Sequence, residues 1–187
     1  MGLFKKKPTA FATVTINARL QPKIRDDFYE KTLAALFKKT KAGEIDGGGT
    51  LLSENGEPLE SDVTFVYYPE YKNKLIEVIR MLPAPVGSRL TFDDSDEKYE
   101  FGTLEGMAVY LNGVDLDPEV YASCDVNEIA ETLANSIDGL ALFSHWHGNK
   151  ETALYFYAPS FEAMKAATAD FISTYPLCQK CHVEKIA

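Results

Sequence analysis

The chain has 187 residues, 45% of them hydrophobic and 25% charged, which is typical of globular proteins and excludes a disordered or collagen-like chain. No apolar run approaches the roughly 20 residues that a membrane helix needs. The three cysteines are an odd number, which argues against a disulfide framework.

The first eight residues are basic, but the apolar segment of a signal peptide does not follow them. Without such a segment or a membrane span, we expect a cytoplasmic protein that does not bind membranes. The net charge of -9 is unevenly placed. Residues 1–92 carry 14 Lys and Arg against 11 Asp and Glu, whereas residues 93–187 carry 5 against 17. Such a one-sided field attracts basic partners and repels the phosphates of nucleic acids.

In chain order, the first half alternates strand and helix signals. Phe11–Leu20 alternates apolar and polar residues, which predicts a strand with one apolar face. Asp26 and Asp27 mark the start of a helix that is expected to reach about Lys39 and to be stopped by Gly43.

Two strands, a helix and a closing strand are expected next. Strands are predicted at residues 45–52 and 63–68, because Asn55-Gly56 between them is a strong hairpin signal. Pro69 opens the following helix, prolines at 83 and 85 end it, and residues 89–92 close the sheet. The order of this half is therefore βαββαβ.

The second half repeats that order. Met107–Leu111 predicts a strand, which a loop and a helix capped by Asp125 or Asn127 follow. A hairpin is expected at residues 140–157, then a helix with Pro159 or Ser160 at its start and a closing strand at residues 182–186. With an offset of 90 residues, Tyr67 falls on Tyr157 and Pro69 on Pro159.

The repeated order predicts an α+β protein with two ferredoxin-like halves, each an antiparallel sheet with helices on one face. The halves are expected at residues 9–92 and 105–187, and the acidic segment 93–104 is expected to be a linker. The other sheet faces would be solvated or buried against each other, by packing of the faces or by joining of the edges. Tyr67 and Tyr157 are candidates for those faces.

A C-x-x-C-H motif stands near the end of the sequence, at Cys178, Cys181 and His182. Haem attachment is rejected, because little chain follows the motif and no export signal precedes it. Zinc held by these cysteines with His145 and His147 is also disfavoured, because the second and fourth strands of a ferredoxin-like sheet are opposite edges, roughly 14 Å apart. No metal or other cofactor is therefore expected.

Three further patterns have simpler structural explanations. Strand alternation places Trp146 opposite His145 and His147, so a buried Trp146 would leave both histidines on the surface. The run 47–49 of three glycines leads into a strand, unlike a phosphate-binding loop. Cys124, at a helix start, is expected to be an inert buried thiol.

The leading functional hypothesis is a non-catalytic, acidic binding protein for a basic protein, such as an inhibitor or a toxin-neutralising immunity protein. The expected contacts are acidic residues in the linker and the loop after it, with three aromatic anchors: Asp93, Asp94, Asp96, Glu97, Glu100, Asp115, Asp117, Glu119, Tyr110, Tyr121 and Trp146. The alternative is an enzyme or small-ligand module with a cleft between the halves, lined by Tyr67, Tyr157, His145 and His147. A third possibility is an assembly subunit whose sheet faces pair with copies of itself.

Overall fold

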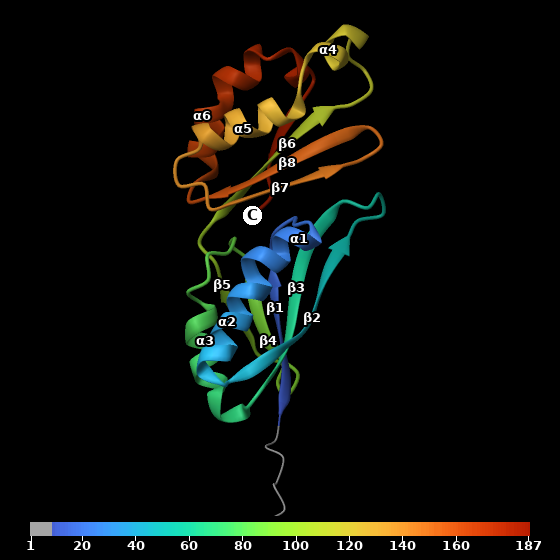
Figure 1. The fold of residues 1–187 in the computed structure, drawn as a ribbon. Coiled ribbons are helices and arrows are strands. Elements are labelled where there is room, and N and C mark those ends of the chain that lie inside the picture. Colours follow the sequence, from blue (N-terminus) through green and yellow to red (C-terminus); the bar gives the residue numbers. More distant parts are fainter. Residues whose placement is uncertain (1–8) are drawn as a thin grey trace, which may run out of the picture.

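The computed structural model describes residues 9–187, which form two antiparallel sheets with helices packed on them (Figure 1). The basic residues within positions 1–8 lie outside the described part. The first sheet contains β1 (Ala10–Ile16), β2 (Gly43–Leu52), β3 (Pro58–Tyr67), β4 (Ser88–Phe92) and β5 (Lys98–Phe101), in the order β2-β3-β1-β4-β5. The second contains β6 (Glu105–Asn112), β7 (Leu142–His147), β8 (Glu151–Ala158) and β9 (His182–Lys185), in the order β7-β8-β6-β9.

The helices lie on one face of each sheet (Figure 1). The first half has α1 (Pro22–Arg25), a π-helical turn at Asp26–Glu30, α2 (Lys31–Thr40) and α3 (Lys72–Ile79). The second half has α4 (Pro118–Ser123), α5 (Val126–Ser136) and α6 (Phe161–Thr174). The arrangement β2-β3-β1-β4 in the first sheet is the same as β7-β8-β6-β9 in the second. The protein is therefore a tandem ferredoxin-like fold, as the sequence predicts.

Local chemistry fixes the helix ends. Pro22 occupies the first turn of α1, where its missing N–H costs nothing. Asp125 caps α5 by accepting the Asn127 backbone N–H at 2.8 Å, and Ser160 caps α6 in the same way. The first helical segment ends at Lys41, which adopts a left-handed conformation with φ 56°, and not at Gly43, which already belongs to β2.

The acidic segment between the halves contains a strand. β5 pairs with β4, for example Leu90 with Tyr99, and so extends the first sheet by one strand beyond the ferredoxin-like four. Leu104 then contacts the segment after α3, because its carbonyl accepts the Val86 N–H at 2.8 Å and its own N–H reaches the Ala84 carbonyl. The connection to the second half is therefore tied to the first half along its length.

The end of the first half packs against the sheet face of the second. This differs from both expected arrangements, in which the two sheets would pack face to face or join at their edges. The end of β1, α1 and the β2–β3 turn of the first half abut the helix-free face of the second sheet (Figure 1). Along β8, Leu154 and Phe156 face the helices, whereas Tyr155 and Tyr157 face the first half. One apolar core consequently runs from Ala12 and Ile16 of the first half into this face. None of the helices in residues 9–187 combines the length and apolar character needed to cross a membrane.

Candidate functional site

A polar cluster holds the two halves together at the centre of their interface. Glu57, directly after the β2–β3 turn, accepts hydrogen bonds on one carboxylate oxygen from the hydroxyls of Tyr110 and Tyr155, at 2.7 and 2.8 Å. Arg19, from the loop after β1, pairs with the same oxygen and also bonds the Tyr110 hydroxyl. Three donors from three segments thus meet on a single carboxylate.

Burial sets the protonation of this cluster. Burial, followed by the hydrogen bond to Glu57, raises the pKa of Tyr110 and of Tyr155 well above the usual value. Burial opposes the charge of Arg19, but its neighbours Tyr110, Glu57 and Tyr155 outweigh this effect and raise its pKa. At neutral pH both hydroxyls therefore stay protonated and donate to the carboxylate.

The segment 19–21 is fixed to the second sheet at further points. The Tyr157 hydroxyl accepts the Arg19 backbone N–H at 2.7 Å, and the Gln21 N–H reaches the Ser144 hydroxyl at 3.3 Å. The Gln21 side chain donates to the backbone carbonyl of His145 at 3.0 Å. Tyr157 and His145 therefore contact one segment of the first half, and the space expected to be a cleft is filled there.

The other two residues of the expected cleft lie elsewhere. Tyr67 is fully buried on the helix-covered side of the first sheet, 5.1 Å from the ring of Phe92. His147 is exposed and bonds Thr152 at the β7–β8 turn. Tyr67 and Tyr157, which the repeat places at equivalent positions, thus face different layers of the molecule.

Aromatic residues form a row across the second sheet on the interface face. Register places Trp146 beside Ala153, Ala153 beside Tyr110, and Tyr110 beside His182. Tyr110 is only 6% exposed and stacks on His182 with ring centroids 4.6 Å apart, and Trp146 is half-buried. The structure therefore gives Tyr110 a structural contact inside the molecule instead of the expected role as an exposed anchor.

A groove remains between the tips of two hairpins. It has a volume of about 610 Å³ and is lined by Trp146 and by polar residues of the β2–β3 and β7–β8 turns: Glu54, Asn55, Gly56, Asn149, Lys150 and Glu151. Of these residues, only Trp146 was expected in a functional site. Arg19, Glu57 and Tyr155 were missed, because no motif marks residues that meet only when two halves dock.

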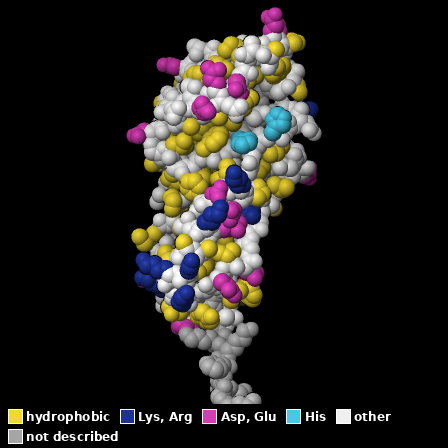
Figure 2. All heavy atoms as spheres, viewed as in Figure 1, with side chains coloured by type: hydrophobic (Ala, Val, Ile, Leu, Met, Phe, Trp, Pro, Cys, Tyr) yellow, Lys and Arg dark blue, Asp and Glu magenta, His cyan; other side chains and the backbone are white. Residues whose placement is uncertain are grey.

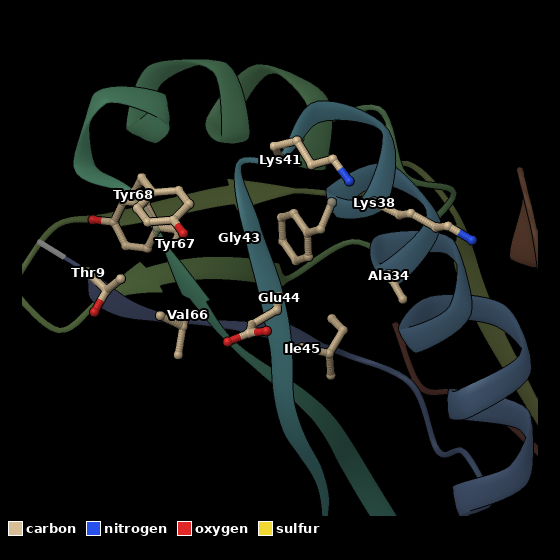
Figure 3. Close-up of a pocket in the computed structure, with 11 residues that line it drawn as sticks. Thr9, Ala34, Lys38, Lys41, Gly43, Glu44, Ile45, Val66, Tyr67 and Tyr68 are labelled. Atoms are coloured by element: carbon tan, nitrogen blue, oxygen red, sulfur yellow. The ribbon is translucent and has the colours of Figure 1, made fainter. Parts of the chain in front are cut away.

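Two further hollows lie in the first half. The pocket in Figure 3, about 360 Å³, has Lys38 and Lys41 on the α2 side and Thr9 and Tyr68 on the opposite side. An apolar groove of about 490 Å³ lies between α2 and α3, lined in part by Leu36, Tyr71 and Leu75. None of these residues except Tyr67, which lines the first pocket, was expected in a site.

The acidic residues form two groups at opposite ends of the molecule. The turn after β4 carries Asp93, Asp94, Asp96 and Glu97, and Glu100 follows in β5. Here Asp94 pairs with Lys72 at 3.0 Å, and Glu97 accepts the Tyr99 hydroxyl at 2.5 Å. The loop and helix start after β6 carry the second group, Asp115, Asp117 and Glu119, beside α4 at the far end of the second half (Figure 1). One partner surface cannot contain both groups side by side.

The second group lies on an ordered loop, which we call the acidic loop (residues 113–119). Asn112 accepts the backbone N–H groups of Val114 and Asp115 at 3.0 and 2.8 Å. Tyr121 is turned inward, where its hydroxyl accepts the Leu116 N–H and donates to the Asn112 carbonyl. The expected anchor Tyr121 thus fixes the acidic loop from inside.

The C-x-x-C-H motif does not converge on one point. Cys178 is buried in the core under α5 and α6, whereas His182 lies on the interface face against Tyr110. Within residues 9–187, no group of three His, Cys, Asp or Glu side chains is placed to hold a metal ion. The motif therefore supplies a pair of thiols without the histidine.

No protein-family model matches the chain, and no curated protein sequence is significantly similar to it. Solved structures that resemble it include two provisionally assigned monooxygenases. That from Fusobacterium nucleatum is 15% identical over 96% of this chain and 91% of that one, with a TM-score of 0.33. That from Lactobacillus acidophilus is 12% identical over 96% and 93%, with a TM-score of 0.34.

The RNA recognition domains 1 and 2 of Sex-lethal from Drosophila melanogaster also match. They are 12% identical over 92% of this chain and 98% of that one, with a TM-score of 0.28. At such identities the likeness concerns the chain path alone, and the activities named for those proteins are not transferred to this one.

Proposed function

We propose that the protein is a non-catalytic cytoplasmic binding protein that holds a basic protein partner on the acidic loop. The observation that supports this proposal most directly is that the loop is held in one conformation while its carboxylates are exposed and unpaired. Asp115, Asp117 and Glu119 are exposed, and none of their carboxylates pairs with a cation within residues 9–187. A loop already fixed by Asn112 and Tyr121 loses little conformational entropy on binding.

Charged residues of both signs lie beside the acidic loop. The start of α5, which follows α4 directly, presents two further acids beside it, Asp125 and Glu128. Two lysines lie next to the loop: Lys180, whose Nζ donates to the Asp115 carbonyl at 2.7 Å, and Lys150, whose carbonyl accepts the Gly113 N–H at 2.8 Å. On the face drawn in Figure 2, acidic side chains lie over the second half, and most Lys and Arg side chains lie over the first half. Such a field accelerates encounters with a basic protein and repels nucleic acid.

Val114 adds an apolar contact, since it is 51% exposed near the start of the acidic loop. The inhibitor or toxin-neutralising role fits this surface, because a protein that must cover a basic active site quickly depends on steering. The group after β4 is a weaker candidate, since Lys72 and Tyr99 already occupy two of its carboxylates.

The test compares two charge reversals of equal size. Asp115→Lys with Glu119→Lys changes the acidic loop, and Asp93→Lys with Asp96→Lys makes the same change at the opposite end. Asp117 is left intact, because it caps α4 by accepting the Glu119 N–H at 2.9 Å. Tagged wild type and both variants are used to capture proteins from lysate at about 50 mM and about 300 mM salt, and the higher salt shortens the screening length about 2.5-fold.

We expect the wild type and the distal variant to retain the same basic protein at low salt and the loop variant to lose it. With the purified partner, the loop variant should associate at least about tenfold more slowly. Capture of an identical set of proteins by the wild type and the loop variant would contradict the proposal, whereas loss with the distal variant alone would move the surface to the turn after β4.

A second candidate function is the binding of a small ligand in the groove at the hairpin tips. Trp146, the single tryptophan of the chain, lines this groove and reports directly on its occupancy. A ligand at about 100 times its dissociation constant should change the fluorescence and stabilise the fold by roughly 2.7 kcal/mol. Metabolite pools that change neither property would leave this candidate without support.

A further inference from the structure

The two cysteines near the end of the chain form the ends of a tight turn. The Cys181 N–H donates to the Cys178 carbonyl at 3.1 Å. Gln179 between them has φ -59° and ψ 136°, and Lys180 has φ 59°. These angles define a type II β-turn, in which the first and fourth Cα atoms lie less than about 7 Å apart.

That separation suits a disulfide. Bridged cysteines usually have Cα atoms about 4.4–6.8 Å apart, so a bond between Cys178 and Cys181 requires little movement of the backbone. The turn is also held from outside, because Lys180 donates from Nζ to the Asp115 carbonyl at 2.7 Å. This contact supports a left-handed lysine, a conformation that residues other than glycine seldom adopt.

The two thiols differ in environment. Cys178 is 4% exposed and packs in the core below the helices, whereas Cys181 is partly exposed. A hydrogen bond from the Cys178 thiol lowers the pKa of Cys181 to about 7, and the same bond, together with burial, raises the pKa of Cys178. An accessible thiol that ionises readily beside a buried partner matches the division between an attacking and a resolving cysteine.

We propose that Cys178 and Cys181 are a redox-active dithiol that small-molecule disulfides, such as oxidised glutathione, convert into an intramolecular disulfide. The Cys181 thiolate attacks one sulfur of the oxidant, forms a mixed disulfide and releases one thiolate. Cys178 then loses its proton to solvent and attacks Cys181 Sγ, which expels the second thiolate. The protein loses two electrons and two protons, and the oxidant is reduced to two thiols.

The proposed dithiol requires no partner on the acidic loop. Of the C-x-x-C-H motif only the two cysteines take part, because His182 lies on the opposite face of the sheet. Cys124, the third free cysteine, is the internal competitor, because it lies close enough to influence the pKa of Cys178. The experiment below also tests whether Cys124 takes part in the reaction.

The test treats the reduced full-length chain with oxidised glutathione, blocks the remaining thiols by alkylation and maps the products by mass spectrometry. We expect a Cys178–Cys181 cross-link, two equivalents of released glutathione and an alkylated Cys124. The rate should follow a single ionisation with a midpoint near pH 7, below the value of about 8.5 of a free cysteine.

Three variants assign the roles. C181S should react at least about tenfold more slowly at pH 7, and C124S should react like the wild type. C178A, which keeps a small apolar side chain in the core, should stop at a stable glutathione adduct on Cys181. Should C178A not fold, the wild type and C181S still decide the question. A cross-link to Cys124, a persistent glutathione adduct on the wild type, or a C181S variant that reacts at the wild-type rate would each overturn the proposal.

Discussion

At the scale of single residues, the Glu57 cluster shows how one carboxylate connects the two halves. The side chains of Glu57 and Arg19 are 12% and 20% exposed, so solvent screens their pairing only in part. Tyr110 and Tyr155 satisfy the same oxygen, which leaves no buried hydroxyl of this cluster without a partner. Disrupting such a cluster strongly lowers stability, because each remaining donor is buried away from water and has lost its acceptor.

We therefore expect Glu57→Ala to lower the free energy of unfolding by about 2–3 kcal/mol, since it leaves Arg19 and two tyrosine hydroxyls unpartnered. Glu54→Ala changes an exposed glutamate in the same turn and should stay within about 0.5 kcal/mol of the wild type. Urea unfolding at neutral pH measures both. Equal stability of the two variants would show that the cluster does not hold the interface.

The buried tyrosines predict alkaline lability. Burial raises the pKa of Tyr110, Tyr155 and Tyr157 in the folded state, while the unfolded value stays near 10. A raised acid pKa contributes stability that is fully present below the unfolded value and is lost as the pH rises above it. The free energy of unfolding should thus be level below about pH 9.5 and then fall, by up to about 1.4 kcal/mol per pH unit for each tyrosine.

Urea unfolding between pH 8 and pH 11.5 tests this expectation, and Tyr155→Phe is the matched variant, because it removes one titrating group at the interface. Above pH 10, the free energy of unfolding of this variant should fall less steeply with pH than that of the wild type, by the contribution of one tyrosine. A wild-type slope of zero up to pH 11.5 would refute the assignment of raised pKa values to these side chains.

At the scale of elements, neighbouring glycines in the run 47–49 of β2 differ in the space around them. A Cβ on Gly48 would lie 2.6 Å from Glu30 Oε1 and 2.9 Å from Arg25 Nε, because this ion pair crosses over the strand. A Cβ on Gly49 would meet nothing within 4 Å. The glycine run thus contains one glycine that makes room for a side-chain pair.

Gly48→Ala should destabilise the protein by about 1–2 kcal/mol through the displaced ion pair, whereas Gly49→Ala should stabilise it by about 0.4–1 kcal/mol by restricting the unfolded chain. Thermal unfolding of the two variants beside the wild type measures the difference. The opposite order of melting temperatures would mean that the Arg25–Glu30 pair does not cross the strand in solution.

Sequence periodicity predicts most elements because each half is built from local signals. Alternation in β1, the Asn55-Gly56 turn and the capping residues of α5 and α6 act within a few residues of each other. It misses β5, whose partner is β4, and α4, a short helix placed between Asp117 and Cys124. β5 depends on a partner strand that no local pattern identifies, whereas α4 has a local start signal, Asp117 as its cap and Pro118 in its first turn, that the periodicity of so short a helix does not show.

At the scale of the whole molecule, the repeat is misleading by one residue. The offset of 90 matches the prolines, but on the helix-facing side Phe65 of β3 corresponds to Phe156 of β8, one residue later. A shift of one residue moves a side chain to the other face of a strand, so Tyr67 is in the core under the helices and Tyr157 is at the interface. The end-to-face packing of the halves therefore could not be read from the repeat.

That packing predicts how the protein unfolds. The core that contains Leu20 and Leu90 continues into Ala153 and Tyr157, so the first half and the interface face share one apolar cluster. Gly102 in the connection has φ 100°, and a Cβ there would lie 2.0 Å from the Pro85 carbonyl oxygen, so the connection is tight as well as short. Separation of the halves would expose this core, and an intermediate with separated halves is disfavoured.

We expect Trp146 fluorescence, which reports the interface, and far-UV circular dichroism, which reports both sheets, to give the same urea midpoint in the wild type. Glu57→Ala removes the polar link between the halves, and its fluorescence midpoint should move below its circular-dichroism midpoint. Exposed Glu54→Ala should keep the two midpoints together. A wild type in which Trp146 is released well before the sheets unfold would mean that the two halves are independent domains, joined by contacts too weak to make the molecule cooperative.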